Sequence, residues 1–364
     1  MWGLRTVVFE RSTAPYPQPR ACHLDAEIAR VFQHLGFEDE LRELCTGAYG
    51  RFAHEAVTPL KQFDQQHWLL ELFHGPTLAF KDVALQLVGR MFDEVLRARG
   101  QRVTIVGATS GDTGSAAIDG VKSCANVDIV ILYPHNRTSD VQRKQMTTVD
   151  APNVHAVAVD GTFDDCQDLV KAMFNDAPFR DRMGLSAVNS INWARVMAQI
   201  VYYVNACDLL AGPVNVCVPS GNFGNVFAGW IAKQMGANID RLIVASNAND
   251  ILVRFFRSND MSAAPVVPSL SPSMDIQVSS NFERLLFEMN GRDGGATAEQ
   301  LQHFRSSGRL SVEPDQRAAH HRRHTRQGRA AVGGGAHHGV VVIALRGGAE
   351  DHLDLHAAGG QRRA

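Results

Sequence analysis

The chain has 364 residues, of which 45% are hydrophobic and 20% are charged, and its formal net charge is −2. This length predicts two domains, and this apolar content predicts sizeable cores and excludes a wholly disordered chain. A charge so close to neutrality gives no electrostatic reason to expect nucleic acid or an anionic membrane as a partner, so a small molecule is the expected ligand.

The amino-terminal region contains no apolar run typical of a secretion signal. No window of the chain approaches the roughly 20 consecutive apolar residues that a membrane-spanning helix needs. The six cysteines include no C-x-x-C pair and no regular framework, which favours a reducing compartment. We therefore expect a cytoplasmic protein that uses no membrane.

The middle of the chain alternates short apolar runs with helical patterns. A strand is expected over "HWLLELF", and apolar residues at helical spacing predict a helix from Asp82 to about Arg99. Further strands are expected at "RVTIVGA", "VDIVILYP", "VHAVAVD", "VNVCV" and "RLIVASN", with helical segments between them. This alternation predicts an α/β protein whose parallel sheets are flanked by helices on both faces.

The organisation changes near residue 315. The segment beyond it has no lysine, no aromatic residue and no sustained amphipathic period, yet it holds seven of the fifteen histidines. Because no spacing among these histidines resembles a ligand set, no metal site is predicted. We expect an irregular His/Arg/Gly/Ala-rich tail over 316–364. Its composition is the one that an unselected reading frame of a GC-rich gene would produce, so a tail read out of frame is a hypothesis.

The first candidate functional residue is Lys81, in the stretch "HGPTLAFKD". An amine that attacks a carbonyl must be neutral, and a free lysine near neutral pH is almost wholly protonated. The N–H dipoles of a helix amino terminus and burial behind Phe80 would lower the pKa of Lys81, whereas Asp82 would raise it. The alternative is a solvated surface lysine, the ordinary role of this residue type.

The second candidate is the loop "PSGNFGN", between a predicted strand and a predicted helix. Gly221 and Gly224 permit positive φ, which would let successive N–H groups point into one concavity at the helix amino terminus, a geometry that suits phosphate. No Gly-Lys-Ser/Thr follows the loop and no G-x-G-x-x-G is present, which disfavours a nucleotide-binding module. A plain strand-to-helix turn is the alternative.

The third candidate is "GATSGDTGSAA", which crowds hydroxyl and carboxyl groups between a strand and a helix. A helix cap by Asp112 or Ser110 is the simpler interpretation. One cap needs one such residue, however, so the crowding predicts a second anion site, fit for a carboxylate or phosphate of a substrate.

An imine-forming lysine, a phosphate cradle and a second anion site together favour pyridoxal 5'-phosphate as the cofactor. The motifs "HGPTLAFKD", "GATSGDTGSAA", "GTFDDCQDLVK", "NSINWARVMAQIVYY", "PSGNFGN" and "SSNFERLLFE" resemble those of threonine synthase in order and spacing, over roughly Leu24 to Gln316. The resemblance implies a fold-type II enzyme, similar in fold to the tryptophan synthase β subunit. It implies a carbon–oxygen lyase of threonine biosynthesis that converts O-phospho-L-homoserine and water to L-threonine and phosphate.

The resemblance also implies a domain organisation. An amino-terminal segment over 1–60, whose first twenty or so residues lack the family's usual opening, precedes a large cofactor domain over 61–100 and 200–315. A smaller α/β domain covers 101–199. The part beyond Gln316 does not resemble the family, in which that part supplies a hydroxyl group facing the pyridine nitrogen. Thr325 has no matching context and is not assigned this role.

The resemblance implies a role for each motif residue. Lys81 would hold the cofactor as an imine and later move protons at the substrate, and Phe80 would shield the imine. Asp112 would approach the 3'-oxygen of the cofactor. The backbone that would hold the cofactor phosphate belongs to Gly221, Asn222, Phe223, Gly224 and Asn225. The candidates for the substrate's anionic groups are Ser110, Thr113, Lys144, Asn192 and Arg195. For Arg195, whose fork geometry suits phosphate, a structural salt bridge is the alternative.

Three other functions stay open. The same cofactor architecture serves serine or threonine dehydratases and cysteine synthases. The atypical tail leaves a catalytically impaired threonine synthase-like protein as an alternative, and a protein that only binds a phosphorylated ligand or a partner is another. Monomer and homodimer both stay open.

Overall fold

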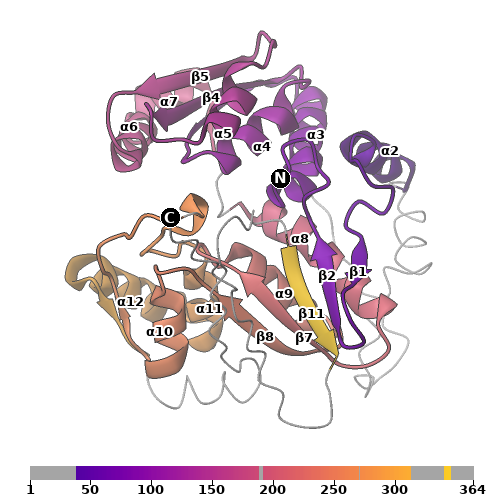
Figure 1. The fold of residues 1–364 in the computed structure, drawn as a ribbon. Coiled ribbons are helices and arrows are strands. Elements are labelled where there is room, and N and C mark those ends of the chain that lie inside the picture. The colour runs from indigo at the N-terminus through magenta and orange to yellow at the C-terminus, as the bar shows by residue number, and fades with distance from the viewer. Residues whose placement is uncertain (1–37, 188–191, 270, 313–339, 346–364) are drawn as a thin grey trace, which may run out of the picture.

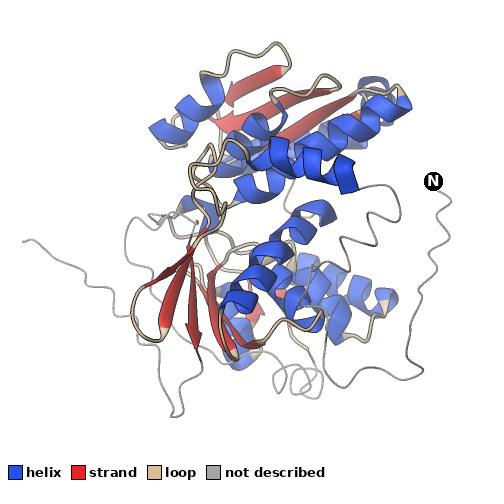
Figure 2. Cartoon of the chain, turned by 90° about the vertical axis from the view of Figure 1, so that its right-hand side faces the viewer, coloured by secondary structure: helices blue, strands red, loops and turns tan. Residues whose placement is uncertain are grey.

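The computed structural model describes residues 38–187, 192–269, 271–312 and 340–345 of the chain (Figure 1). Helices and strands in these residues form two halves, each built around its own sheet. Figure 2 shows helices lying between the two groups of strands. The α/β class expected from the sequence is confirmed.

The first half is built on a four-stranded sheet. Its elements are α3 (Lys81–Arg99), β3 (Val103–Ala108), α4 (Asp112–Val121), β4 (Val127–Pro134), α5 (Asp140–Thr147), β5 (Val154–Val159), α6 (Phe163–Asn175), α7 (Ala177–Met183) and β6 (Leu185–Ser186). The strand order is β5-β4-β3-β6, and every pair of neighbours is parallel. Ile105 packs against α3 and α4 on one face, and Val106 packs against Cys166 of α6 on the other. Helices therefore cover both faces, as predicted.

The second half is built on a five-stranded sheet. Its first elements are β1 (Leu60–Gln62), β2 (His67–Glu71), α8 (Trp193–Leu209), β7 (Val214–Pro219), α9 (Gly224–Gln234) and β8 (Ile239–Ala245). They are followed by α10 (Ile251–Ser258), β9 (Met261–Ser262), the 3-10 helix η1 (Pro272–Met274), α11 (Phe282–Met289), α12 (Gly294–Ser307), β10 (Arg309–Leu310) and β11 (Val340–Leu345). Helix α2 (Glu38–Tyr49) precedes them in the chain and packs against α3 of the first half (Figure 1). The five strands lie in the order β1-β2-β11-β7-β8.

Strand β11 lies in the middle of this sheet, although it belongs to the segment that was expected to be an irregular tail. It pairs antiparallel with both β2 and β7, whereas β7 and β8 are parallel. Val341 and Ile343 are buried in the main core. The expectation of an irregular tail over 316–364 is therefore wrong for Val340–Leu345. The apolar, β-branched run "VVVIAL" is itself typical of a buried strand, but the Gly-, Ala- and His-rich context on both sides led to its being counted as part of the tail. Thr325 lies outside the described residues.

The largest core cluster lies under the five-stranded sheet and is rich in aromatic side chains. Phe255 and Phe282 meet edge to face with ring centroids 4.7 Å apart, and Phe223 lies 5.9 Å from Phe282. Such edge-to-face pairs add to the stabilisation that burial alone gives. Because Phe223 belongs to the loop after β7, this cluster anchors that loop to the core.

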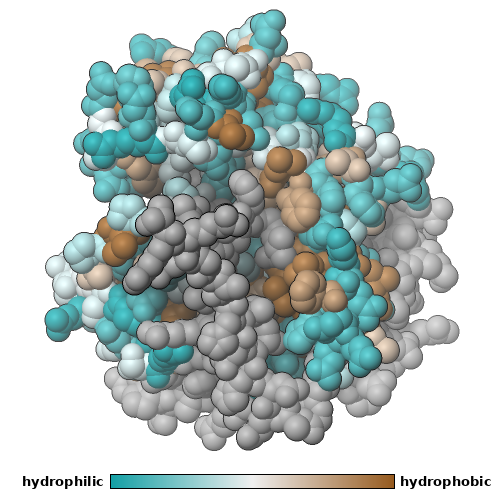
Figure 3. Space-filling view, viewed as in Figure 1, coloured by the Kyte–Doolittle hydropathy of each residue, from teal (hydrophilic) through white to brown (hydrophobic). Residues whose placement is uncertain are grey.

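Among the described residues, no helix is both long and apolar enough to cross a bilayer. In the view of Figure 3, the surface over the four-stranded half is mainly hydrophilic.

Candidate active site

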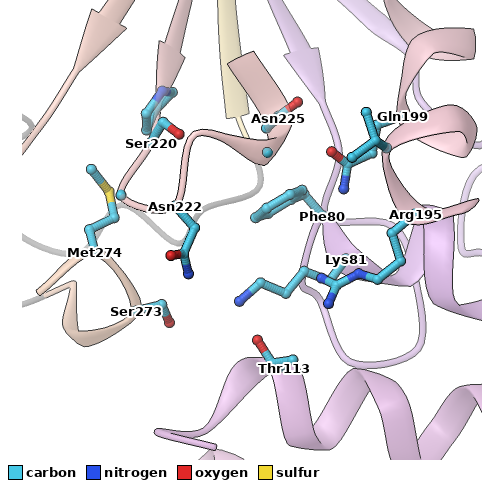
Figure 4. Close-up of a pocket in the computed structure, with 14 residues that line it drawn as sticks. Phe80, Lys81, Thr113, Arg195, Gln199, Ser220, Asn222, Asn225, Ser273 and Met274 are labelled. Carbon is cyan, nitrogen blue, oxygen red and sulfur yellow. The ribbon is translucent and has the colours of Figure 1, made fainter. Parts of the chain in front are cut away.

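A pocket between the two halves brings together side chains from four of the motifs (Figure 4). Its lining residues come from the start of α3, the start of α4, helix α8, the loop after β7 and the 3-10 helix η1. They are Phe80, Lys81, Thr113, Arg195, Val196, Gln199, Pro219, Ser220, Gly221, Asn222, Gly224, Asn225, Ser273 and Met274.

Lys81 is the first residue of α3 and points into this pocket. Its Nζ lies 2.8 Å from Oδ2 of Asp112, and the two side chains are only 11% and 8% exposed. Burial lowers the pKa of Lys81, the carboxylate of Asp112 opposes this shift, and the charge of Arg195 adds to it. The lysine is thus a buried amine whose proton is held by a specific acid, which is the arrangement that a functional lysine needs.

Asp82, which follows Lys81 in the sequence, is bound to Thr77 and is not the acid paired with Lys81. Asp82 accepts hydrogen bonds from the backbone N–H and the hydroxyl of Thr77, both at 2.7 Å. Burial raises the pKa of Asp82 to about 6. A Cβ on Gly75 would lie 2.4 Å from the Cβ of Asp82, so a glycine is required there. The sequence analysis expected Asp82 to raise the pKa of Lys81, but Asp112 is the acid that does so.

Arg195 supplies a second buried cation. It is 3% exposed, and its Nε and Nη1 atoms have no hydrogen-bond partner among the described residues. Burial lowers the pKa of Arg195 to about 10, so the guanidinium remains charged at neutral pH. Because unpartnered N–H groups on a buried charge are costly, such a group indicates a site for an anion. Figure 4 shows the guanidinium beside the Lys81 side chain.

The loop after β7 lies between a strand and a helix, as expected, and its positive φ falls on a residue other than glycine. Positive φ occurs at Phe223, with φ of 63°, and not at Gly221 or Gly224. Gly221 is favoured for another reason, because a Cβ there would lie 3.1 Å from the Cα of Met274, a tight contact with backbone. The ring of Phe223 is buried in the core, and Phe223 is not among the residues that line the pocket.

The start of α9 is held so that it faces the pocket. The hydroxyl of Ser220 accepts a hydrogen bond from the Phe223 N–H at 3.1 Å. The Asn225 Oδ1 accepts hydrogen bonds from the hydroxyls of Tyr202 and, at 2.7 Å, Tyr203. The first N–H groups of a helix have no partner inside the helix. This end of α9 is therefore a pre-organised site for phosphate.

The loop before α4 is organised by a residue that the sequence analysis did not single out as its cap. The Thr109 hydroxyl accepts hydrogen bonds from the N–H groups of Gly111 and Gly114, at 3.0 and 2.9 Å. Helix α4 has no side-chain cap from its N-cap residue Gly111, so the simpler interpretation of Asp112 or Ser110 as a cap is wrong. Asp112 is instead directed at Lys81, and Thr113 lines the pocket.

Three candidate substrate contacts do not line the pocket. Ser110 lies next to Gly111 but is not among the lining residues. Asn192 caps α8, with its Oδ1 accepting a hydrogen bond from the Ala194 N–H at 2.9 Å. Lys144 is exposed on α5. Their roles toward a substrate stay predictions.

Gln199, Ser273 and Met274 also line the pocket and were not predicted from the sequence. Gln199 lies one helical turn after Arg195, so helical spacing from a candidate arginine was a usable signal. Ser273 had no such signal, because it lies in η1, next to a polar network that joins this segment to the loop after β8. In that network, Asp275 accepts hydrogen bonds from Asn247 at 2.7 Å and from Asn249 at 3.0 Å.

The "SSNFERLLFE" motif does not line the pocket and supports it from behind. The Ser280 hydroxyl donates to Oδ1 of Asn222 at 3.2 Å, and the Asn281 N–H donates to the Asn222 carbonyl at 3.1 Å. These contacts fix the side chain and the backbone of Asn222 at the pocket wall.

The donor set of the pocket suits an organic anion better than a metal. No cluster of three or more His, Cys, Asp or Glu side chains that could hold a metal occurs in the described parts of the chain. The pocket offers two buried cations and the amino terminus of α9. It can therefore bind a phosphorylated compound and place a carbonyl group beside the Lys81 amine.

Comparisons with known proteins agree on one group of relatives. A family profile described as "Pyridoxal-phosphate dependent enzyme" matches residues 52–319. The chain is 59% identical over 281 residues to a threonine synthase of Pseudomonas aeruginosa, covering 76% of this chain and 60% of that protein. The chain thus spans about three fifths of the length of this curated relative.

Solved structures give the same result. The structure of threonine synthase from Brucella melitensis with bound PLP has a TM-score of 0.78 and 47% identity, covering 87% of this chain and 71% of that one. The structure of yeast threonine synthase has a TM-score of 0.76 and 41% identity, covering 84% of this chain and 66% of that one.

Proposed function

Since the chain belongs to the pyridoxal-phosphate dependent enzyme family, within its threonine synthases, we propose that it converts O-phospho-L-homoserine and water to L-threonine and phosphate. The observation that carries the proposal is the Lys81–Asp112 ion pair of 2.8 Å in a pocket that also holds the unpartnered guanidinium of Arg195. The reaction can use an amine that moves protons, an acid beside it and a cation that binds phosphate.

Pyridoxal 5'-phosphate fits the residues of this pocket. The amine of Lys81 would attach the cofactor, and the backbone from Gly221 to Asn225 at the start of α9 would hold its phosphate. The close approach of Gly221 to Met274 keeps this wall free of side chains. Asp112, which is paired with Lys81, would approach the 3'-oxygen of the cofactor. When bound, the cofactor supplies an electron sink for negative charge at the substrate's α carbon.

Lys81 would be the group that moves protons at the substrate's α and β carbons. A base must be neutral to accept a proton, and burial together with Arg195 favours the neutral amine. Asp112 keeps the Nζ of Lys81 at one position and favours its protonated form. Lys81 can therefore return the proton that it has accepted. This balance brings the pKa of Lys81 closer to neutral pH than that of a free lysine.

Arg195 would bind the phosphate group of the substrate. Its Nε and Nη1 atoms are free to donate in the described structure, and a guanidinium fork matches two phosphate oxygens. The negative charge on this group increases as it leaves, so a fixed cation there stabilises the departure. Thr113, which lies near the Lys81 side chain in Figure 4, would add a hydroxyl donor. Ser110, Lys144 and Asn192 remain candidates for the substrate's other anionic atoms.

The apolar members of the pocket would limit the access of water. Phe80 lies beside the lysine, with Nζ 5.7 Å from its ring centroid, and Val196 and Met274 line other parts of the wall. Exclusion of bulk water strengthens each charge interaction in the pocket. It would also protect the bond between Lys81 and its cofactor from hydrolysis.

We place the enzyme in the cytoplasm, with a small-molecule substrate and no nucleic acid as a partner. The described cysteines are free thiols, and a reducing compartment keeps thiols in that form. The formal net charge of −2 supports no large electrostatic surface for nucleic acid.

The test combines a spectrum with a product assay. Purified chain and Lys81→Ala are mixed with pyridoxal phosphate, and the absorbance band of the lysine-bound cofactor is recorded. Phosphate and threonine are then measured after addition of O-phosphohomoserine. We expect the band and both products from the unaltered chain and neither from the variant. Deamination of serine or threonine instead would identify a dehydratase, and a band without products would identify a protein that binds the cofactor without turnover.

A further inference from the structure

Helix α5 contacts both of the loops that carry Lys81 and Asp112, although it contributes no side chain to the pocket lining. Its side chains at 142, 145 and 146 contact these loops, and its exposed residue Val141 faces away from them. The helix begins at Asp140 with a cap from Ser139, whose hydroxyl accepts a hydrogen bond from the Gln142 N–H. The cap fixes the amino end of the helix, and the contacts of Gln145 and Met146 fix its last turn.

Gln145 contacts the loop that presents Lys81. Its Nε2 donates a hydrogen bond of 3.1 Å to the carbonyl oxygen of Thr77. The N–H and hydroxyl of Thr77 both donate to Asp82, so all three polar groups of this residue have partners. The next residue, Leu78, has a φ of 63°, a conformation that is strained for a side chain of this size. A strained turn keeps its shape only where its neighbours hold it, and Gln145 is one of the groups that hold it.

Two other residues of α5 contact the loop that presents Asp112. A Cβ on Gly111 would lie 2.0 Å from the Oε1 atom of Gln142, so the backbone of Gly111 lies directly against this side chain. A Cβ on Gly114 would lie 2.8 Å from the sulfur of Met146, which is 1% exposed. Helix α5 thus supports the Asp112 loop through packing and the Lys81 loop through a hydrogen bond.

We propose that Gln145 is a positioning residue for Lys81. By holding the Thr77 carbonyl from a helix that also supports the Asp112 loop, it sets the separation between the Lys81 amine and the Asp112 carboxylate. Gln145 touches neither of these groups and acts through Thr77. The proposal deepens the proposed function and rests on it for its kinetic consequence, while its structural consequence does not need that function.

The test uses Gln145→Met, which keeps the length of the side chain and removes the donor. The control is Val141→Ala, an exposed position on the same helix. Gln145→Glu, which has the same shape without the N–H donor, serves if the methionine variant does not fold. Two measurements are made on cofactor-free protein: hydrogen exchange of the Thr77 and Leu78 amides, and the rate at which acetic anhydride labels Lys81, followed by mass spectrometry.

We expect Gln145→Met to accelerate exchange of these two amides and labelling of Lys81 by about three- to tenfold, the range that loss of one hydrogen bond gives. The control should match the unaltered chain. Unchanged exchange would overturn the proposal, because the hydrogen bond would then not hold the loop. Faster exchange with unchanged labelling would also overturn it, because the loop would then not control Lys81.

A kinetic measurement separates this inference from the proposed function. In the phosphate-release assay, we expect kcat of Gln145→Met to fall about three- to tenfold with KM within twofold, because the amine is misplaced while the anion site is intact. A raised KM with unchanged kcat would contradict positioning of Lys81. If the unaltered chain shows no turnover, the proposed function fails, and the exchange and labelling results still decide the role of Gln145.

Discussion

Lys81 at the start of α3 and Asp112 at the start of α4 form an ion pair of 2.8 Å, and both side chains are almost fully buried. The pair joins two motifs that lie far apart in the sequence. Burial favours loss of the proton from the Lys81 amine, and the carboxylate of Asp112 favours its retention. Burial and this ion pair therefore decide the charge of Lys81 together.

Replacement of the acid should shift the titration of Lys81. In Asp112→Asn the carboxylate that raises the pKa of Lys81 is lost, while burial and Arg195 still lower it. We therefore expect the pKa of Lys81 to fall below its value in the unaltered chain, with kcat reduced by about tenfold or more. The pH dependence of Lys81 labelling in cofactor-free protein measures the shift. An unchanged or raised pKa would show that Asp112 does not act on the lysine.

Asp82 should make the stability of the protein depend on pH. Burial raises its pKa from 3.8 to about 6 in the folded state, so the folded state binds this proton more tightly than the unfolded chain. The resulting contribution, of about 2–3 kcal/mol, is present below pH 3.8 and is lost as the pH rises through about 6.

Asp82→Asn should remove this dependence. The free energy of unfolding in urea, measured between pH 4 and pH 7 for both proteins, gives the comparison. We expect its decrease with rising pH to be smaller in the variant. Parallel pH profiles would assign the titration to another group.

Arg195 should lower the stability of the free protein and strengthen substrate binding. A buried guanidinium with unpartnered Nε and Nη1 atoms destabilises the free protein. We expect Arg195→Leu to raise the free energy of unfolding by about 1–3 kcal/mol, while KM for O-phosphohomoserine rises by about a hundredfold or more through loss of the charged hydrogen bonds.

Arg195→Lys is the matched control, because it keeps the charge and loses the fork. Its KM should lie between those of the unaltered chain and the leucine variant. A leucine variant that is less stable and binds substrate normally would indicate that Arg195 has a structural role only.

Gly221 should tolerate no side chain. In Gly221→Ala the new Cβ would lie 3.1 Å from the Cα of Met274 and 3.2 Å from a methyl group of Ile276. The backbone must then move, at a cost of about 1–3 kcal/mol, and the affinity for pyridoxal phosphate should fall about tenfold or more. Gly294→Ala is the control, since a Cβ there has no neighbour within 4 Å. Equal cofactor affinities in the two variants would show that the loop containing Gly221 does not bind the cofactor phosphate.

Local sequence determined the elements that present the site. Apolar spacing predicted the helix that begins beside Lys81, and the motif "PSGNFGN" predicted a strand, a loop and a helix, which the structure confirms at β7 and α9. These predictions succeeded because periodicity and turn residues act over a few neighbours along the chain. The six motifs likewise indicated the family, because each lies within one contiguous stretch.

Tertiary structure alone decided how these pieces meet. Asp112 and not the neighbouring Asp82 pairs with Lys81, because α4 packs along α3 and Thr77 turns the Asp82 carboxylate away. Phe223 takes the positive φ expected of glycine, because its ring is anchored in the aromatic core. Strand β11 lies in the centre of a sheet whose other strands come from distant segments. Contacts between distant segments depend on the packing of the whole chain, and local spacing does not specify them.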